Sequence, residues 1–152
     1  MTTAYSLSLY VKHPFRDPEA IAETFGLKAI HSHRAGEPRR TPTGVPLEGT
    51  YAESYACFDF EPAAPLDEQI LRVSRFLRRH EPLLCMLQSE GGRLSYQIGF
   101  SRSSLPVILP PGAFAAAAAL GIEVGVSIYA VAQRHGRRGE NRIEEAADDG
   151  TG

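Results

Sequence analysis

The sequence predicts an α+β domain: a ferredoxin-like βαββαβ core preceded by an extra βαβ portion, with a mainly antiparallel sheet and three helices on one face. Two observations support this prediction. Several segments alternate apolar and polar side chains with a period of two, which is typical of half-buried strands. Three others carry the start and stop signals of helices. The order of the elements, β-α-β-β-α-β-β-α-β, contains the βαββαβ pattern in its last six elements and again in its first six.

Six segments are predicted to be strands. In residues 4–11, Leu7, Leu9 and Val11 alternate with polar side chains, so we expect one apolar face and one wet face. A glycine pair at 91–92 separates two further runs, and such a pair between strands is typical of a two-residue hairpin turn. The predicted strands are residues 4–11, 27–33, 50–60, 81–90, 93–100 and 122–130.

Three segments are predicted to be helices. The first has Asp17 as its N-cap, Pro18 at its first position and Gly26 just after its end. The second, over residues 66–79, carries an apolar stripe at helical spacing with arginines on the opposite side. The third, over residues 110–120, begins with prolines and is rich in alanine. We expect all three to pack on the same face of the sheet.

The length and composition predict one domain with a polar tail. The chain has 152 residues and a formal net charge of −2, which fits a single domain over residues 1–134. Residues 135–152 contain only one aliphatic side chain larger than alanine. Burying it cannot offset the conformational entropy that the segment would lose on folding, so we expect a disordered tail. Residues 34–49 contain three prolines and three glycines without periodicity, which predicts a surface loop.

The same composition argues against several classes of protein. No apolar run has the length of a membrane span, and the first residues lack the pattern of a signal peptide, so we expect a cytoplasmic protein that does not enter membranes. The slightly acidic charge disfavours a nucleic acid as partner. Cys57 and Cys85 both lie in apolar runs and are interpreted as buried thiols rather than as a disulfide framework.

His31 and His33 form the sharpest local pattern. Residues two apart on a strand face the same side, so two imidazoles in this spacing are weak candidates for a shared metal site. A third ligand would come from Glu37 or His13, although neither spacing is distinctive. The alternative interpretation is two partly exposed histidines where a strand passes into a loop.

The loop that follows adds a basic and aromatic cluster. Arg34 and Arg39, with Arg40 beside them, are positioned to receive a phosphate or an acidic partner. Tyr51 and Tyr55 belong to the next strand and, with Tyr10, are candidates for stacking against the bases of RNA. The alternative is a solvated loop without function. We assign a ligand- or partner-binding role to His31, His33, Arg34, Glu37, Arg39, Tyr51 and Tyr55.

Four stretches resemble a known family: Phe25-Gly26-Leu27, residues 33–36, the aromatic strand "YAESYACF" and the closing "LGIEVGVSIY". Over residues 5–130 the chain is similar to the bacterial family called domain of unknown function 4279. The resemblance implies the fold and no particular activity. Members often carry a tryptophan in the aromatic strand, where this chain has Cys57 or Phe58.

The sequence favours a non-enzymatic binding or interaction module without cofactors, similar to immunity proteins that block a partner protein. It lacks the G-x-S-x-G motif of a serine nucleophile and any glycine-rich phosphate loop. Two alternatives stay open: a small metal-dependent or ligand-sensing enzyme using His31 and His33, and an RNA-binding ferredoxin-like domain. Open sheet edges also make a homodimer compatible with the sequence.

Overall fold

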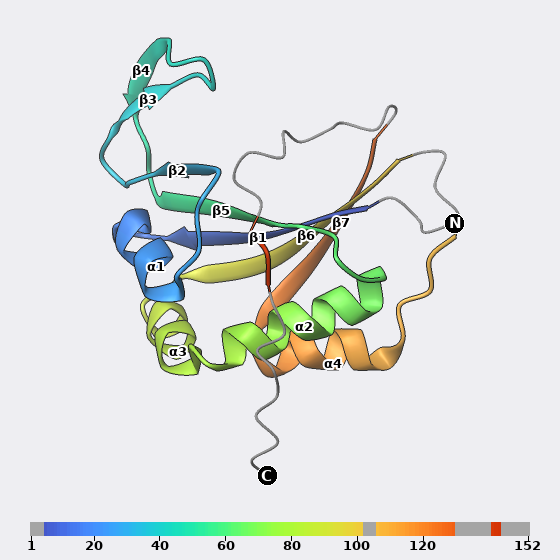
Figure 1. The fold of residues 1–152 in the computed structure, drawn as a ribbon. Helices are drawn as coiled ribbons and strands as arrows, with labels where there is room; N and C mark the ends of the chain where they lie inside the picture. Colours follow the sequence, from blue (N-terminus) through green and yellow to red (C-terminus); the bar gives the residue numbers. More distant parts are fainter. Residues whose placement is uncertain (1–4, 102–105, 130–140, 144–152) are drawn as a thin grey trace.

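The structure of the chain, a computed structural model, describes residues 5–101, 106–129 and 141–143 (Figure 1). These residues form an α+β fold of helices and strands that alternate irregularly along the chain. The elements are β1 (Tyr5–His13), α1 (Pro18–Phe25), β2 (His31–His33), β3 (Pro38–Arg40), β4 (Pro46–Thr50), β5 (Ser54–Phe60), α2 (Leu66–Arg78), α3 (Glu81–Ser89), β6 (Arg93–Ser101), α4 (Pro111–Ala119) and β7 (Ile122–Tyr129).

Five strands form one mixed, mainly antiparallel sheet in the order β2-β5-β1-β6-β7. β1 lies at the centre and pairs antiparallel with both β5 and β6, while β7 pairs parallel with β6. β3 and β4 form a separate two-stranded hairpin. Figure 1 shows the four described helices on one side of the sheet and the hairpin rising from the opposite side. Among the described residues, no helix is long and apolar enough to cross a membrane.

The core lies between the sheet and the helices. The apolar positions of the alternating strands point into it, among them Leu7, Leu9 and Phe58, each at most 1% exposed. Tyr96 on β6 is fully buried there, and its hydroxyl is 2.7 Å from the Ser74 hydroxyl of α2. The burial of these apolar side chains stabilises the fold.

The predicted signals of the first helix are confirmed. The Asp17 carboxylate accepts a hydrogen bond from the backbone N–H of Glu19, Pro18 opens α1, and Gly26 adopts a left-handed φ of 69° at its end. α2 and α4 also lie where the sequence predicts helices. A left-handed residue after a helix favours glycine because it has no Cβ to clash with the preceding turn.

The segment 81–90 is a helix, α3, and not the predicted strand. Its apolar run is ambiguous by periodicity alone. The burial pattern resolves the ambiguity, since Leu84 and Leu87, three residues apart, are buried, whereas Cys85 and Met86 between them are exposed. Gly91 and Gly92 therefore join α3 to β6 instead of forming a hairpin. The described residues therefore contain four helices where the sequence predicts three. The expected βαββαβ order over residues 50–130 is not found.

The segment 34–49 also differs from the predicted loop, because it contains β3 and most of β4. Its prolines are tolerated in this hairpin because both strands are exposed at every position and belong to no larger sheet. Thr50 ends β4, so the long strand predicted over 50–60 is shorter and begins at Ser54. The expected burial of Ala56, Phe58 and Phe60 in that strand is confirmed.

Asn141, Arg142 and Ile143 lie in the segment expected to be a disordered tail, and the structure places them against the sheet. The Asn141 backbone donates to the Asp59 carbonyl (2.7 Å), and its side chain bonds both the N–H and the carbonyl of Lys28 (2.8 and 2.9 Å). Ile143 is 8% exposed and belongs to the core. The rest of the predicted tail lies outside the described residues, so the expectation of a disordered tail stays a prediction.

A prediction tests the junction of α3 and β6. A Cβ added to Gly92 would lie 2.6 Å from the Leu87 carbonyl oxygen and 2.9 Å from the His13 ring. We expect Gly92→Ala to lower the free energy of unfolding by about 1–3 kcal/mol, because backbone and a buried ring would both have to shift. Chemical denaturation measures this.

The matched control is Gly112→Ala in α4, where a Cβ meets nothing within 4 Å. Alanine is the better helix former, so this change should preserve the stability or raise it by up to about 1 kcal/mol. Equal effects of the two substitutions would contradict the close packing at Gly92.

Candidate functional site

The sheet face opposite the helices is polar. Strand residues point alternately to the two faces, so the positions between the core residues all point to this face, which no described helix covers. On the central strand these are Ser6, Ser8 and Tyr10. Further polar side chains come from three neighbouring strands: Tyr55, Cys57 and Asp59 on β5, Ser95 and Gln97 on β6, and Ser127 and Tyr129 on β7.

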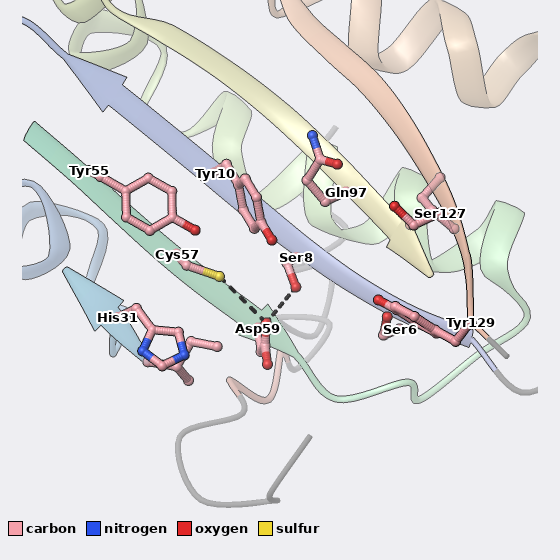
Figure 2. A pocket seen from close by; sticks show the side chains of 12 residues that line it. Ser6, Ser8, Tyr10, His31, Tyr55, Cys57, Asp59, Gln97, Ser127 and Tyr129 are labelled. Atoms are coloured by element: carbon pink, nitrogen blue, oxygen red, sulfur yellow. Dashed lines mark hydrogen bonds between the residues drawn. The ribbon is translucent and has the colours of Figure 1, made fainter. Parts of the chain in front are cut away.

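A cavity of about 190 Å³ opens on this face and is shown in Figure 2. Side chains of β1, β5, β6 and β7 line it, and Ile30 and His31 border it at β2. A second hollow, of about 220 Å³, adjoins it and shares Tyr10 and Gln97 with it. Lys12 and an ion pair of Arg93 with Glu123 lie in this second hollow. We call the first cavity the polar hollow.

Two glycines on this polar face make room for side chains that line the hollow. A Cβ on Gly99 of β6 would overlap the Tyr129 ring and the Ser6 hydroxyl. A Cβ on Gly125 of β7 would lie 2.6 Å from the side-chain oxygen of Gln97. Neither glycine has a positive φ, so their role is the space that they leave. They allow Tyr129 and Gln97 to lie across the neighbouring strand.

A buried carboxylate lies in the polar hollow. Asp59 is only 7% exposed, and its Oδ1 accepts a hydrogen bond from the hydroxyl of Ser8, the residue paired with it across β1 and β5. The Cys57 thiol lies 3.8 Å from the same oxygen. Among the described residues no cation lies within ion-pair distance of Asp59. Burying a carboxylate without a counter-charge is unfavourable for folding alone.

The groups around Asp59 are neutral hydrogen-bonding groups. Burial raises the pKa of the Cys57 thiol to about 12, and the nearby Asp59 charge adds to the effect. Burial likewise raises the pKa of Tyr55 and that of Tyr10. The thiol and both hydroxyls are therefore protonated at neutral pH and can donate hydrogen bonds. A thiol with so high a pKa is a poor nucleophile.

The structure brings some of the predicted site residues to the hollow. His31 and Tyr55 line it. His33 lies next to it, with its ring stacked on that of Tyr51 at 3.5 Å between centroids and facing Tyr55 at 5.4 Å. The Nδ1 atom of His33 is buried without a hydrogen-bond partner.

The remaining predicted residues lie at the β3–β4 hairpin and do not line the polar hollow. The Arg34 carbonyl accepts a hydrogen bond from the backbone of Glu37, whose carbonyl accepts one from the Tyr51 backbone. Arg39 reaches the Glu48 carbonyl across the hairpin at 3.4 Å, and Arg40 bonds the Tyr51 hydroxyl through its backbone. These contacts hold the hairpin together at its base.

The described residues contain no group of three His, Cys, Asp or Glu side chains arranged to hold a metal ion. His13, a candidate third ligand, is buried at the end of β1, where its Nδ1 accepts hydrogen bonds from the backbones of Phe15 and Arg16. Its other nitrogen lies 3.2 Å from Glu90. His13 thus fixes the turn after β1.

Sequence reasoning did not single out Ser8, Gln97 or Tyr129 as candidate site residues. The alternation in β1 and β5 indicates a wet face, but the pairing that places Ser8 opposite Asp59 joins residues 51 positions apart. Glycines within otherwise alternating strands are the one local signal, since they often mark a close approach of other atoms.

No family model matches this chain, and no curated protein or solved structure matches it either. The resemblance to the domain of unknown function 4279 therefore stays a prediction.

A second prediction concerns pH. Burial lowers the pKa of His33 below its usual value of 6.5, so the folded chain holds fewer protons there than the unfolded chain. Its contribution to the free energy of unfolding is fully present above about pH 6.5 and is lost as the pH falls through the lower folded value. We expect stability to fall less on acidification in His33→Gln than in the unaltered protein, as measured by denaturation at about pH 8 and pH 5.

The control is His31→Gln, because His31 is exposed and unstacked. It should retain the pH dependence of the unaltered protein. An unchanged pH dependence in His33→Gln would show that the stacked imidazole contributes nothing.

Proposed function

We propose that this chain is a non-enzymatic binding module whose recognition surface is the polar face of the sheet, opposite the described helices. The observation that carries the proposal is the polar hollow, which side chains of four strands line and which contains the buried carboxylate of Asp59. An aspartate is seldom buried in a folded protein unless it is paired with another group. The hollow supports binding of a small polar ligand, because ligand pockets are concave and combine rings with a few placed polar groups.

The chemistry of the hollow favours binding over catalysis. The protonated thiol of Cys57 and the protonated hydroxyls of Tyr10 and Tyr55 supply hydrogen bonds and not a nucleophile. The metal-dependent enzyme is also the weaker candidate. His31 lines the hollow, whereas the His33 ring is stacked on Tyr51, so the two imidazoles are not placed to share a metal ion.

An RNA-binding function is also less well supported. Tyr10 and Tyr55 meet edge to face at 5.4 Å, so their rings pack against each other and do not form a flat platform for bases. The buried Asp59 carboxylate on this face would repel a phosphate backbone.

The finer classification is part of the proposal. A ferredoxin-like core is supported by the position of β5, which lies between β1 and β2, two strands connected through α1. This is the split βαβ arrangement. On this view α4 and β7 are an addition after the core, where the sequence suggests an extra portion before it. Membership of the domain of unknown function 4279 rests on the sequence motifs.

The β3–β4 hairpin favours a second candidate function, the docking of a partner protein, as immunity proteins do. Every residue of both strands is exposed, and Val45 and Leu47 are 56% and 44% exposed. Because both strands are exposed, the hairpin buries little apolar surface and contributes little to the stability of the fold. Its exposed strand edges suit the addition of a strand from another chain.

The ligand proposal predicts saturable binding of small polar molecules. Titration of the ¹⁵N-labelled chain with diols, hydroxy acids, amino alcohols and monosaccharides should shift the amide signals of β1, β5 and β6 for at least one of them. Tyr10→Ala should weaken that binding about tenfold, a loss of about 1.4 kcal/mol. Phe114→Ala, a matched change at an exposed aromatic residue of α4, should leave it unchanged. Shifts confined to the helices, or none, would contradict the proposal.

The docking candidate predicts a partner that needs the hairpin. A protein that copurifies with the chain should be lost with Leu47→Asp, because a charge would be buried at the interface. It should be retained with Leu71→Asp, a substitution at an exposed leucine of α2. Retention of the same protein by both variants would rule out the hairpin as its docking site.

A further inference from the structure

We infer that the polar hollow binds a small molecule through an organic ammonium group, with Asp59 as its counter-ion. The inference rests on the proposed function and names the class of ligand. Ser8 and Cys57 both approach the Oδ1 atom of Asp59, as the dashed lines of Figure 2 show. An ionised carboxylate can accept about four hydrogen bonds, and among the described residues Oδ2 accepts none.

The charges around the hollow point to a cation. Asp59 is the one carboxylate among the described lining residues, and His31 is the one basic side chain. Lys12 lies four residues from Ser8 along β1, which is about 13 Å at the rise of a strand, and it faces the adjoining hollow. Arg93 in that second hollow is paired with Glu123. A ligand cation would supply the counter-charge that no described residue gives to Asp59, whereas an anion would be repelled.

The remaining walls suit the rest of such a ligand. Tyrosine rings attract cations at their faces, and Tyr10 and Tyr55 both line the hollow. The serine hydroxyls and the Gln97 amide offer hydrogen bonds to a polar body. The cavity of about 190 Å³ equals roughly six water molecules in liquid volume. The ligand is therefore a small amine with hydroxyl or other polar groups.

Three probes of similar size and different charge test the inference. They are 2-aminoethanol, ethane-1,2-diol and glycolate, each titrated into the full ¹⁵N-labelled chain near neutral pH. We expect 2-aminoethanol to shift the amide signals of Ser8, Cys57 and Asp59 saturably. The neutral and the anionic probe should bind at least tenfold more weakly, because neither can form an ion pair with Asp59.

Two variants identify the carboxylate responsible. Asp59→Asn should weaken the binding of 2-aminoethanol at least tenfold. Glu123→Gln is the matched control, because Glu123 is an exposed carboxylate in the adjoining hollow and is already paired with Arg93. It should leave the affinity within about twofold. If Asp59→Asn does not fold, the comparison of the three probes on the unaltered chain decides by itself.

The outcomes separate the two proposals. Equal or tighter binding of the diol or of glycolate in the hollow, or unchanged binding of 2-aminoethanol to a folded Asp59→Asn, would overturn the ammonium assignment and leave the binding function standing. If 2-aminoethanol and every other small polar molecule tested fail to bind, both proposals are wrong.

Discussion

The double pairing of β1 is the constraint on which the rest of the structure depends. β1 lies between β5 and β6, so hydrogen bonds on both edges fix the direction of each of its side chains. Leu7, Leu9 and Val11 enter the core, while Ser8 and Tyr10 face the polar hollow. A shift of one residue would exchange these two sets. The burial of the core residues therefore fixes the register of the strands, and that register places the side chains that line the hollow.

This coupling gives the candidate site a rigid base. Ser8 lies opposite Asp59 on one side and opposite Gln97 on the other, so three polar groups of the hollow meet across adjacent strands. Sites built on strands hold their geometry better than sites on loops. A ligand that binds such a site loses less free energy to the ordering of side chains. The glycines at 99 and 125 add to this by letting side chains lie flat across the sheet.

Local signals predicted much of the fold, and pairing between distant segments explains what they missed. Period-two alternation located β1, β6 and β7, and the caps at Asp17 and Gly26 located α1. The apolar run at 81–90 fits either a strand or a buried helix, so local sequence could not decide it. His31 and Tyr55 were assigned to a site from their residue types, but the role of Asp59 depends on Ser8, which only the sheet register brings beside it.

The hairpin and the polar hollow meet at one aromatic stack. Tyr55 lines the hollow and faces His33, which in turn lies flat on Tyr51 at the base of the hairpin. The Tyr51 hydroxyl holds the backbone of Arg40, and its own backbone bonds Gly36 and Glu37. A ligand against Tyr55 and a protein against the hairpin would thus contact the two ends of one packed group. Two binding events influence each other only when they favour different arrangements of what they share. The buried, unpartnered Nδ1 of His33 marks the part of the stack where the present arrangement is least satisfied. Among the described residues, His33 is the ring that contacts both Tyr51 and Tyr55, so it joins the hairpin to the wall of the hollow.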